Sequence, residues 1–198
     1  MSKIYLASGS PRRKELLTQI GISYEIMCSD VEEITTKTLP QDVVQELSYC
    51  KAKAVCRELE ERVDGEKEFV VIGADTVVAL GNQIMGKPKD KQDACRMLGS
   101  LQGNTHQVYT GVTICYKKEG KEPDFQNFYE KTDVIMCLMS IKEIEAYVET
   151  GEPMDKAGAY AIQGGCAAYI KGIQGDYYNV VGLPVSRLYQ ELKTRKLL

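Results

Sequence analysis

The segment Ser8–Lys14 combines hydroxyl groups and cations in a pattern that could bind phosphate. It follows a short apolar run and contains a proline that suits the first position of a helix, so it is expected to turn from a strand into a helix. A helix start directs free backbone N–H groups and the positive end of its dipole outward, which favours bound phosphate. The other interpretation is an ordinary capped helix with a solvated basic first turn. The candidate contacts are Ser8, Ser10, Arg12, Arg13 and Lys14.

Carboxylates in two further segments could hold a metal ion or activate water. Asp75, followed by Thr76, comes directly after the apolar run 69–72, which is typical of a buried central strand. A carboxylate at the end of such a strand lies where α/β folds bind ligands, and it could hold Mg²⁺ or Mn²⁺ or accept a proton from water. Glu33, in the acidic pair Glu32-Glu33 of a polar loop, could supply a second oxygen ligand. Alternatively, Asp75 only makes a turn and the glutamates are solvated.

Four more positions could contact a nucleotide. Lys87 stands between a glycine and a proline, and lysine suits a point-charge contact with phosphate. Asp155 and Lys156 precede a run of small residues that permits close backbone approach. Gln163 brings an amide that both donates and accepts hydrogen bonds. Simpler interpretations stay open, since Lys87 could be an exposed loop lysine and Asp155 could pair structurally with Lys156.

Composition limits the classes of protein to which this chain can belong. Its 198 residues, 43% of them hydrophobic, suffice for one domain with a sizeable core, so a single domain over residues 1–198 is expected. A net charge of -3 gives no global basic field, so stable nucleic-acid binding is not expected. No apolar run approaches the roughly 18 residues needed to cross a bilayer. The N-terminal segment also lacks a secretory pattern, so we expect a cytoplasmic protein without membrane contact.

The seven cysteines and the single histidine form no metal-binding or disulfide pattern. No C-x-x-C pair occurs and the number of cysteines is odd, so reduced, buried thiols are expected. His106 is isolated in the sequence, and we expect it to make a structural hydrogen bond in a strand.

The apolar periodicity predicts the elements that position these segments. Strands are predicted at residues 4–7, 22–27, 69–72 with a continuation at 77–80, 83–85, 107–116, 125–139 and 160–173. Helices are predicted at residues 11–20, 40–62, 90–101, 141–149 and 184–193, and a polar loop at 29–38. Helices interleaved with buried strands predict an α/β fold. We expect a single α/β/α unit in which a long mixed sheet forms a cleft between two lobes.

These segments, taken in order, resemble the Maf family of nucleoside-triphosphate pyrophosphatases over nearly the whole chain. The matching segments are Leu6–Arg13, Glu32-Glu33, Gly73–Thr76, Gly86–Pro88, His106, Thr110–Val112, Pro153, Asp155–Tyr160, Ile162–Gly164 and Val181–Pro184. The resemblance implies a deep cleft of the kind found in inosine-triphosphate pyrophosphatases. It also implies hydrolysis of a nucleoside triphosphate to the monophosphate and pyrophosphate with a divalent metal, Mg²⁺ or Mn²⁺.

The resemblance further implies roles for particular residues. Asp75 corresponds by position to the family's proposed proton acceptor, and Arg12, Thr76 and Gln163 correspond to its specificity positions. The sequence Ile-Gln-Gly at 162–164 resembles the branch that acts on dTTP and UTP. Family members are often dimers, so a homodimer is expected, and they have been linked to arrest of septum formation in bacterial division. A house-cleaning role against non-standard nucleotides is also implied.

Release of pyrophosphate requires water to attack the α-phosphorus. That step needs a base or a metal to form hydroxide, and cations to stabilise charge on the leaving group. The acidic candidates are Asp75 and Glu33. The cationic candidates are Arg12, Arg13, Lys14, Lys53 and Lys87. Two rival functions stay open: a nucleotide-binding regulator of cell division that acts through protein contacts, and a kinase or NTPase that cleaves the γ-phosphate. The absence of a Walker A sequence counts against the second rival.

Overall fold

The computed structural model describes residues 2–28, 31–62 and 67–198, and its strands form one mixed sheet. The strands are β1 (Lys3–Leu6), β2 (Glu25–Ile26), β3 (Phe69–Leu80), β4 (Gln83–Met85), β5 (Thr105–Lys117), β6 (Asp124–Met136) and β7 (Ile170–Gln174). The sheet order is β2-β1-β3-β5-β6-β7, with β4 beside β3. β1 is parallel to β2 and β3, whereas the other pairs are antiparallel. The predicted α/β fold with a long mixed sheet is confirmed.

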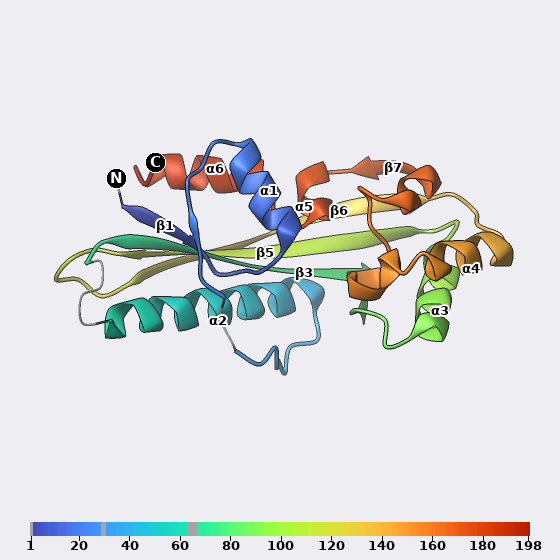
Figure 1. Ribbon diagram of the computed structural model, residues 1–198, viewed down its shortest axis with the longest axis horizontal. Helices are drawn as coiled ribbons and strands as arrows, with labels where there is room; N and C mark the ends of the chain where they lie inside the picture. Colours follow the sequence, from blue (N-terminus) through green and yellow to red (C-terminus); the bar gives the residue numbers. More distant parts are fainter. Residues whose placement is uncertain (1, 29–30, 63–66) are drawn as a thin grey trace.

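Helices cover both faces of this sheet (Figure 1). They are α1 (Pro11–Gln19), α2 (Pro40–Glu61), α3 (Lys91–Leu101), α4 (Ile141–Glu149), α5 (Tyr177–Val181) and α6 (Val185–Thr194), with short 3-10 helices η1 (Glu152–Asp155), η2 (Ala157–Ala159) and η3 (Gly165–Tyr169). α2 runs along one face, while α1 and α6 lie on the other face at the end that holds β1 (Figure 1). α3 and α4 lie at the opposite end of the molecule. None of the described helices is long and apolar enough to cross a membrane.

Each end of the molecule has its own apolar core. At the β1 end, one cluster includes Leu17 of α1 and Leu188 of α6, both packed on the sheet. On the opposite face, a second cluster includes Val55 of α2. A third cluster, which includes Leu98 of α3 and Val148 of α4, fills the other end. The long strands β3, β5 and β6 join the two ends (Figure 1).

One edge of β3 is covered by neighbouring strands only in part. β1 pairs with Phe69–Ile72 and β4 pairs with Val78–Leu80, so among the described strands none pairs on this edge with residues 73–77. The other edge of the same stretch is paired with β5 throughout. Beyond the bond from the Ala7 N–H to the Ile72 carbonyl, 2.9 Å long, the chain leaves the sheet and turns into α1. The sheet therefore has a notch beside residues 73–77 of β3.

Two glycines allow α2 to approach the sheet closely at this notch. A Cβ atom on Gly73 would lie 2.8 Å from the backbone N of Ala52, and one on Gly111 would lie 2.8 Å from that of Gln45. Asp75 pairs directly with Gly111 and shares a sheet face with Gly73, because side chains two residues apart on a strand point to the same side. Because neither glycine has a side chain, the backbone of α2 can lie against the sheet next to Asp75.

Asp75 does not end its strand as the sequence predicted. β3 continues from Phe69 to Leu80, and Gly73 does not interrupt it. The physical reason is that Gly73 accommodates α2 and does not make a turn. The strand that does end here is the parallel neighbour β1, which stops at Leu6.

The stretch 160–173 is also not the strand that was predicted. It begins with a turn, continues as the 3-10 helix η3, and joins the sheet only from Ile170 onward. The backbone N–H groups of Ala161 and Gly165 are bonded to side chains instead of to a neighbouring strand. A glycine-rich run with its N–H groups engaged in this way cannot extend the sheet.

Other boundaries and environments differ in smaller ways. The predicted strand 22–27 is reduced to Glu25–Ile26, which pair with Tyr5 and Leu6 of β1. In the predicted loop 29–38, residues 29 and 30 lie outside the described residues, and residues 31–38 form no helix or strand. All seven cysteines are free, as expected. Only three of them are buried, namely Cys56, Cys115 and Cys166.

Candidate active site

A cavity of about 580 Å³ opens at the notch beside β3. It is lined by the β1–α1 turn, the middle of β3, the loop after β4, the segment 155–163 and the residues that precede α6. α2 contributes Leu47 and Lys51 to the wall. Both ends of the molecule therefore contribute to one site.

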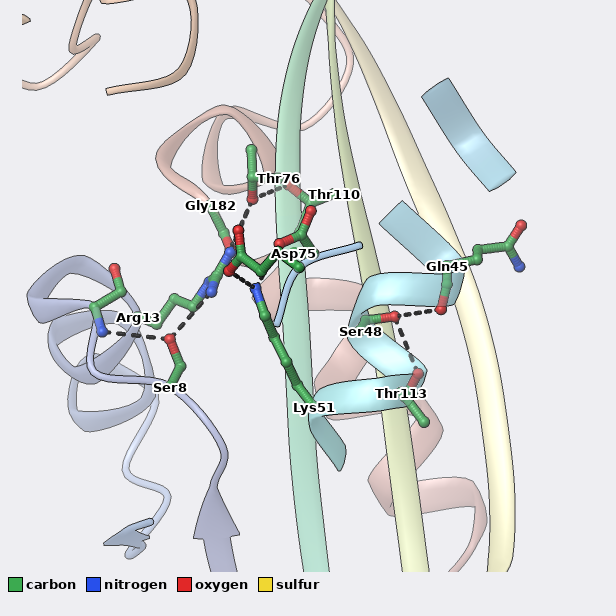
Figure 2. Close-up of polar contacts among 12 residues, drawn as sticks. Ser8, Arg13, Gln45, Ser48, Lys51, Asp75, Thr76, Thr110, Thr113 and Gly182 are labelled. Atoms are coloured by element: carbon green, nitrogen blue, oxygen red, sulfur yellow. Dashed lines mark hydrogen bonds and ion pairs between the residues drawn. The ribbon is translucent and has the colours of Figure 1, made fainter. Parts of the chain in front are cut away.

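Lys51 of α2 bridges two carboxylates in this cavity. Its Nζ donates a hydrogen bond to Oδ1 of Asp75 at 2.6 Å and lies 2.6 Å from Oε1 of Glu33. The side chains of Asp75 and Lys51 are 9% and 15% exposed, whereas that of Glu33 is 61% exposed. Figure 2 shows Lys51 reaching from α2 to Asp75. Asp75 and Lys51 thus form a buried ion pair, with Glu33 on its solvent side.

The environment gives the two carboxyl groups opposite pKa shifts. Burial raises the pKa of Asp75 above its ordinary value, although Lys51 and Arg13 act to lower it. The hydrogen bond from Lys51 is the main cause that lowers the pKa of Glu33. A carboxylate with a raised pKa holds a transferred proton more firmly, which favours general-base catalysis. Asp75 is therefore the better proton acceptor of the two.

Arg13 of α1 reaches the site from the side away from α2 (Figure 2). Its Nη1 donates to Oγ of Ser8 at 3.0 Å, its Nη2 to Oγ1 of Thr76 at 3.1 Å, and its Nε to the carbonyl of Gly182 at 2.9 Å. Burial lowers the pKa of Arg13, while the nearby Asp75 carboxylate raises it. A guanidinium nevertheless stays protonated in proteins. The result is a permanent positive charge whose position is fixed by three hydrogen bonds.

The hydroxyl of Thr76 is also fixed in place. Its Oγ1 lies 2.9 Å from Oγ1 of Thr110, which donates to the carbonyl of Asn179 at 3.0 Å. Because the Thr110 proton is used in that bond, Thr76 donates to Thr110 and accepts from Arg13. Arg13 and Thr76 thus support each other at the wall of the cavity.

Further charged and polar side chains lie around the cavity. Lys156 pairs with Asp155, and this hydrogen bond is the main cause that lowers the pKa of Asp155. Nη1 of Arg12 lies 3.9 Å from Oδ2 of Asp155. Lys87 and Gln163 line the cavity and are exposed. These groups are available to a ligand that enters from solvent.

No three His, Cys, Asp or Glu side chains converge as metal ligands within the described part of the chain. The Lys51 ammonium occupies the position between Glu33 and Asp75, 2.6 Å from Oε1 of the first and Oδ1 of the second, so a divalent ion would have to use the other carboxylate oxygens. Mg²⁺ is usually bound by one or two carboxylates, with substrate phosphates and water completing its coordination. The two carboxylates therefore fit a divalent ion that binds together with a triphosphate.

The cavity brings together most of the residues singled out in the sequence. Those that line it are Ser8, Ser10, Arg12, Arg13, Glu33, Asp75, Thr76, Lys87, Asp155, Lys156 and Gln163. Lys14 and Lys53 are not among the described residues that line it. Lys14 is half-buried on α1, and Lys53 is exposed with its Nζ 5.4 Å from the centre of the Tyr49 ring.

Lys53, a cationic candidate from the sequence, does not line the cavity among the described residues, whereas Lys51, which was not a candidate, does. The positions of the two lysines around the axis of α2 explain the difference and can be read from the sequence. Lys51 follows the buried Leu47 by one helical turn and precedes the buried Val55 by another, so it lies beside the face that packs on the sheet. Lys53 is two residues further along, which places it about 200° around the helix axis from Lys51.

His106 makes the structural hydrogen bond that was expected from the sequence. Its Nε2 lies 2.7 Å from Oη of Tyr160, and both residues are buried. Burial lowers the pKa of His106 to about 4, although Asp133 acts to raise it, so the ring is neutral near pH 7. Of the residues that the structure describes, Tyr160 lines the cavity and His106 does not, so His106 contributes to the site by holding the Tyr160 side chain in place.

Comparison with known proteins adds to this geometry. The chain matches the family described as Maf-like protein over residues 3–195. A relative from Agathobacter rectalis named dTTP/UTP pyrophosphatase is 53% identical over 199 residues, covering 98% of this chain and 97% of the relative. A relative of the same name from Lachnoclostridium phytofermentans is 49% identical over 193 residues, covering 98% of this chain and 95% of its own length. The solved structure of the Staphylococcus aureus Ham1 protein is 16% identical and covers 69% of this chain and 72% of its own, with a TM-score of 0.45.

Proposed function

Because this chain belongs to the Maf-like protein family, we propose that it is a nucleoside-triphosphate pyrophosphatase that acts on dTTP and UTP. Both relatives described above are named dTTP/UTP pyrophosphatase and align with nearly the whole chain. The proposal treats residues 1–198 as one unit, since the cavity is lined by residues from Ala7 to Gly182. A division regulator acting only through protein contacts is not favoured, because the relatives' names describe an enzyme.

The observation that carries the proposal is the placement of a buried carboxylate and a fixed guanidinium in one cavity. Asp75 is held by Lys51 from the α2 side, and Arg13 is fixed by Ser8, Thr76 and Gly182 (Figure 2). A proton acceptor beside a permanent positive charge is the minimum that hydrolysis of a phosphoanhydride requires.

In the proposed complex, the triphosphate lies along the cations of the cavity. Arg13 contacts it from its fixed position, while Arg12, Lys87 and Lys156 reach it from the more accessible parts of the wall. Ser8 and Ser10 add hydroxyl groups at the start of α1. Positive charge arranged before the reaction stabilises the charge that develops on the departing pyrophosphate.

The proposed reaction is an attack of water on the α-phosphorus. The new bond forms between the water oxygen and that phosphorus, and the bond from phosphorus to the bridging oxygen of the β-phosphate breaks. Asp75 accepts the proton that the water loses, and the hydrogen bond from Lys51 orients the carboxylate and keeps it ionised. Pyrophosphate leaves with the electron pair of the broken bond. A divalent ion held by Asp75 and Glu33 would supply further positive charge to the phosphate oxygens.

Specificity in this proposal rests on Gln163. Uracil and thymine present O4 as an acceptor and N3–H as a donor on one edge, and a fixed glutamine amide complements both. Cytosine reverses this pattern, so discrimination against CTP requires that the amide is prevented from flipping. Gln163 lines the same cavity as Arg13 and Asp75, which allows one nucleotide to contact all three.

The test is to identify the products of a panel of triphosphates incubated with Mg²⁺, Mn²⁺ or a chelator. The proposal predicts pyrophosphate and the monophosphate from dTTP and UTP, with loss of turnover when the metal is chelated. Orthophosphate and a diphosphate would instead indicate cleavage of the γ-phosphate. Binding without products would indicate a regulator. The expected homodimer and cytoplasmic location stay predictions from the sequence.

A further inference from the structure

The turn that carries Gln163 is held at both ends by a buried phenol and a carboxylate. A hydrogen bond of 3.2 Å from the Gly164 N–H to the Ala161 carbonyl closes this turn, and Gln163 is exposed within it. The Ala161 N–H donates to Oη of Tyr147 at 3.2 Å. The Gly165 N–H donates to Oε2 of Glu152 at 3.1 Å. The side chains of Tyr147 and Glu152 therefore hold the backbone on either side of Gln163.

The phenol and the carboxylate are joined to each other. Oη of Tyr147 donates to Oε1 of Glu152 at 2.6 Å. Burial, followed by this hydrogen bond, raises the pKa of Tyr147, so the phenol keeps the proton that it donates. Tyr147 is 6% exposed and belongs to the apolar core around α3 and α4. Tyr147 thus anchors the pair in a packed core.

Gly164 leaves the space that this arrangement needs. A Cβ atom at this position would collide with both carboxylate oxygens of Glu152. Glu152 also begins η1, whose last residue is Asp155, and Lys156 follows directly. The same carboxylate therefore connects two segments that line the cavity.

We infer that Tyr147 and Glu152 form a positioning unit that fixes the turn of Gln163 and thereby sets discrimination among nucleobases. The inference rests on the proposed function, in which Gln163 reads the base. Neither Tyr147 nor Glu152 lines the cavity among the described residues, so both act through the backbone of the turn. Without them, the backbone that carries Gln163 is no longer held at both ends, so the amide is no longer presented to the base from one fixed position and discriminates less between uracil and cytosine.

The experiment compares Tyr147→Phe, Glu152→Ala and Glu152→Gln with the wild type. The quantity measured is the ratio of kcat/KM for UTP to that for CTP. Loss of a hydrogen bond to a charged group changes an equilibrium by about tenfold or more, so we expect the ratio to fall about tenfold in Tyr147→Phe and Glu152→Ala. The loss is expected mainly as a higher KM for UTP, because the turn contributes to binding and not to the chemical step. Glu152→Gln keeps one acceptor oxygen and is expected to retain part of the ratio.

Tyr169→Phe is the matched control. Tyr169 donates to Glu143 at 3.5 Å near the same core, and it does not line the cavity among the described residues. This variant is expected to keep the wild-type ratio. Inhibition by inorganic tripolyphosphate, which has no base, is expected to be unchanged in all four variants.

A ratio within twofold of wild type in folded Tyr147→Phe and Glu152→Ala would overturn the inference. Weaker inhibition by tripolyphosphate would overturn it as well, because the whole cavity would then be disturbed. Should either variant fail to fold, Glu152→Gln provides the same comparison with less loss of shape. If the wild type does not distinguish UTP from CTP, the proposed base reading fails. Hydrogen exchange at the Ala161 and Gly165 amides still tests the positioning unit, which requires faster exchange in the variants than in Tyr169→Phe.

Discussion

Asp75 on β3 lies directly opposite Gly111 on β5, where a side chain on Gly111 would collide with the backbone of α2. The glycine thereby admits the helix to the sheet at the position where Lys51 can reach the Asp75 carboxylate, 2.6 Å away. The ion pair of the site thus depends on a residue that contributes no functional group to it. Five experiments test this arrangement and the function proposed for it.

Asp75→Asn should abolish most turnover while the fold is kept. Asparagine preserves the shape of the side chain but cannot accept the proton from water, and loss of a general base lowers the rate by about 10²–10⁴. The check is kcat for UTP in a variant with a native circular dichroism spectrum.

The same variant also tests how Asp75 affects stability. Burial raises the pKa of Asp75 in the folded state, so the Asp75 carboxyl contributes to folding stability below its unfolded pKa, and this contribution is lost as pH rises through its folded pKa. The variant should therefore be no less stable than wild type at pH 7. Near-wild-type kcat would remove Asp75 from the mechanism.

Lys51→Met should displace the acidic limb of the pH–rate profile to higher pH. Lys51 lowers the pKa of Asp75, so its removal raises that pKa and leaves less ionised carboxylate at a given pH. The activity lost at pH 6 should exceed that lost at pH 9, as measured by kcat/KM for UTP across this range. Lys53→Met, the same change on the exposed side of α2, should leave the profile in place. Equal displacement in both variants would contradict the role of the ion pair.

Arg12→Ala and Arg13→Ala should differ in their effect on stability. Arg12 is within reach of one carboxylate at 3.9 Å, so its loss should raise KM for all triphosphates with little change in Tm. Arg13 makes three hydrogen bonds, and its loss should also destabilise the fold by about 1–3 kcal/mol because Thr76, Ser8 and Gly182 lose a charged donor. Kinetics and thermal unfolding of each variant, with Arg13→Lys as the charge-preserving comparison, provide the check. An Arg13→Ala variant with wild-type KM and kcat would show that the turn is only a helix start.

Gln163→Glu should erode the preference for uracil and thymine. A carboxylate offers only acceptors, so it leaves O4 of these bases unpaired and suits the N1–H and N2–H₂ groups of guanine. A site with an unpaired polar group discriminates by roughly 1–3 kcal/mol per group. The measurement is kcat/KM for dTTP, UTP, CTP, GTP and 7-methyl-GTP, with Gln190→Glu on the exposed face of α6 as control. An unchanged ranking in Gln163→Glu, or a wild type that prefers GTP, would show that Gln163 does not read the base.

Gly111→Ala should destabilise the protein, whereas Gly99→Ala should not. The added methyl group on Gly111 would meet the backbone of α2, and overpacking of this kind costs about 1–3 kcal/mol or more. Gly99 lies within α3 with no atom near its missing Cβ, so alanine there should stabilise the helix by about 0.5–1 kcal/mol. Urea unfolding of both variants gives the comparison. Equal stability of the two would mean that α2 can move away from the sheet without cost.

The elements with strong periodicity were predictable from the sequence, and most of the residues predicted for the candidate site line one cavity. The helix at 40–62 and the buried strand starting at Phe69 follow directly from apolar spacing. The turn Ser8–Arg13 and the carboxylates Glu33 and Asp75 were found because their residue types suit phosphate and metal chemistry.

The misses have a common physical cause. The predicted strand 69–72 stops before Gly73, but the role of Gly73 is set by the backbone of α2 at Ser48 and Ala52, which lie 21 or more residues away in the chain. The run 160–173 has a strand-like composition, but its Ala161 and Gly165 N–H groups donate hydrogen bonds to side chains of α4 and η1. In both places the local structure depends on contacts with a segment that is distant in the sequence, and the local residue pattern does not indicate those contacts.

The long strands at the centre of this molecule also determine how it can move. β3 and β5 are paired without interruption from Phe69–Lys117 to Ala79–Gln107, past the notch and into both halves. Closure by a hinge requires a few residues that can absorb large changes in φ and ψ, and a continuous ladder provides none without breaking its hydrogen bonds. The continuous sheet therefore connects the two ends of the molecule rigidly, and both ends contribute residues to the cavity. We therefore expect nucleotide entry and product exit to depend on side chains and connecting loops around the cavity and not on a hinge between the two halves.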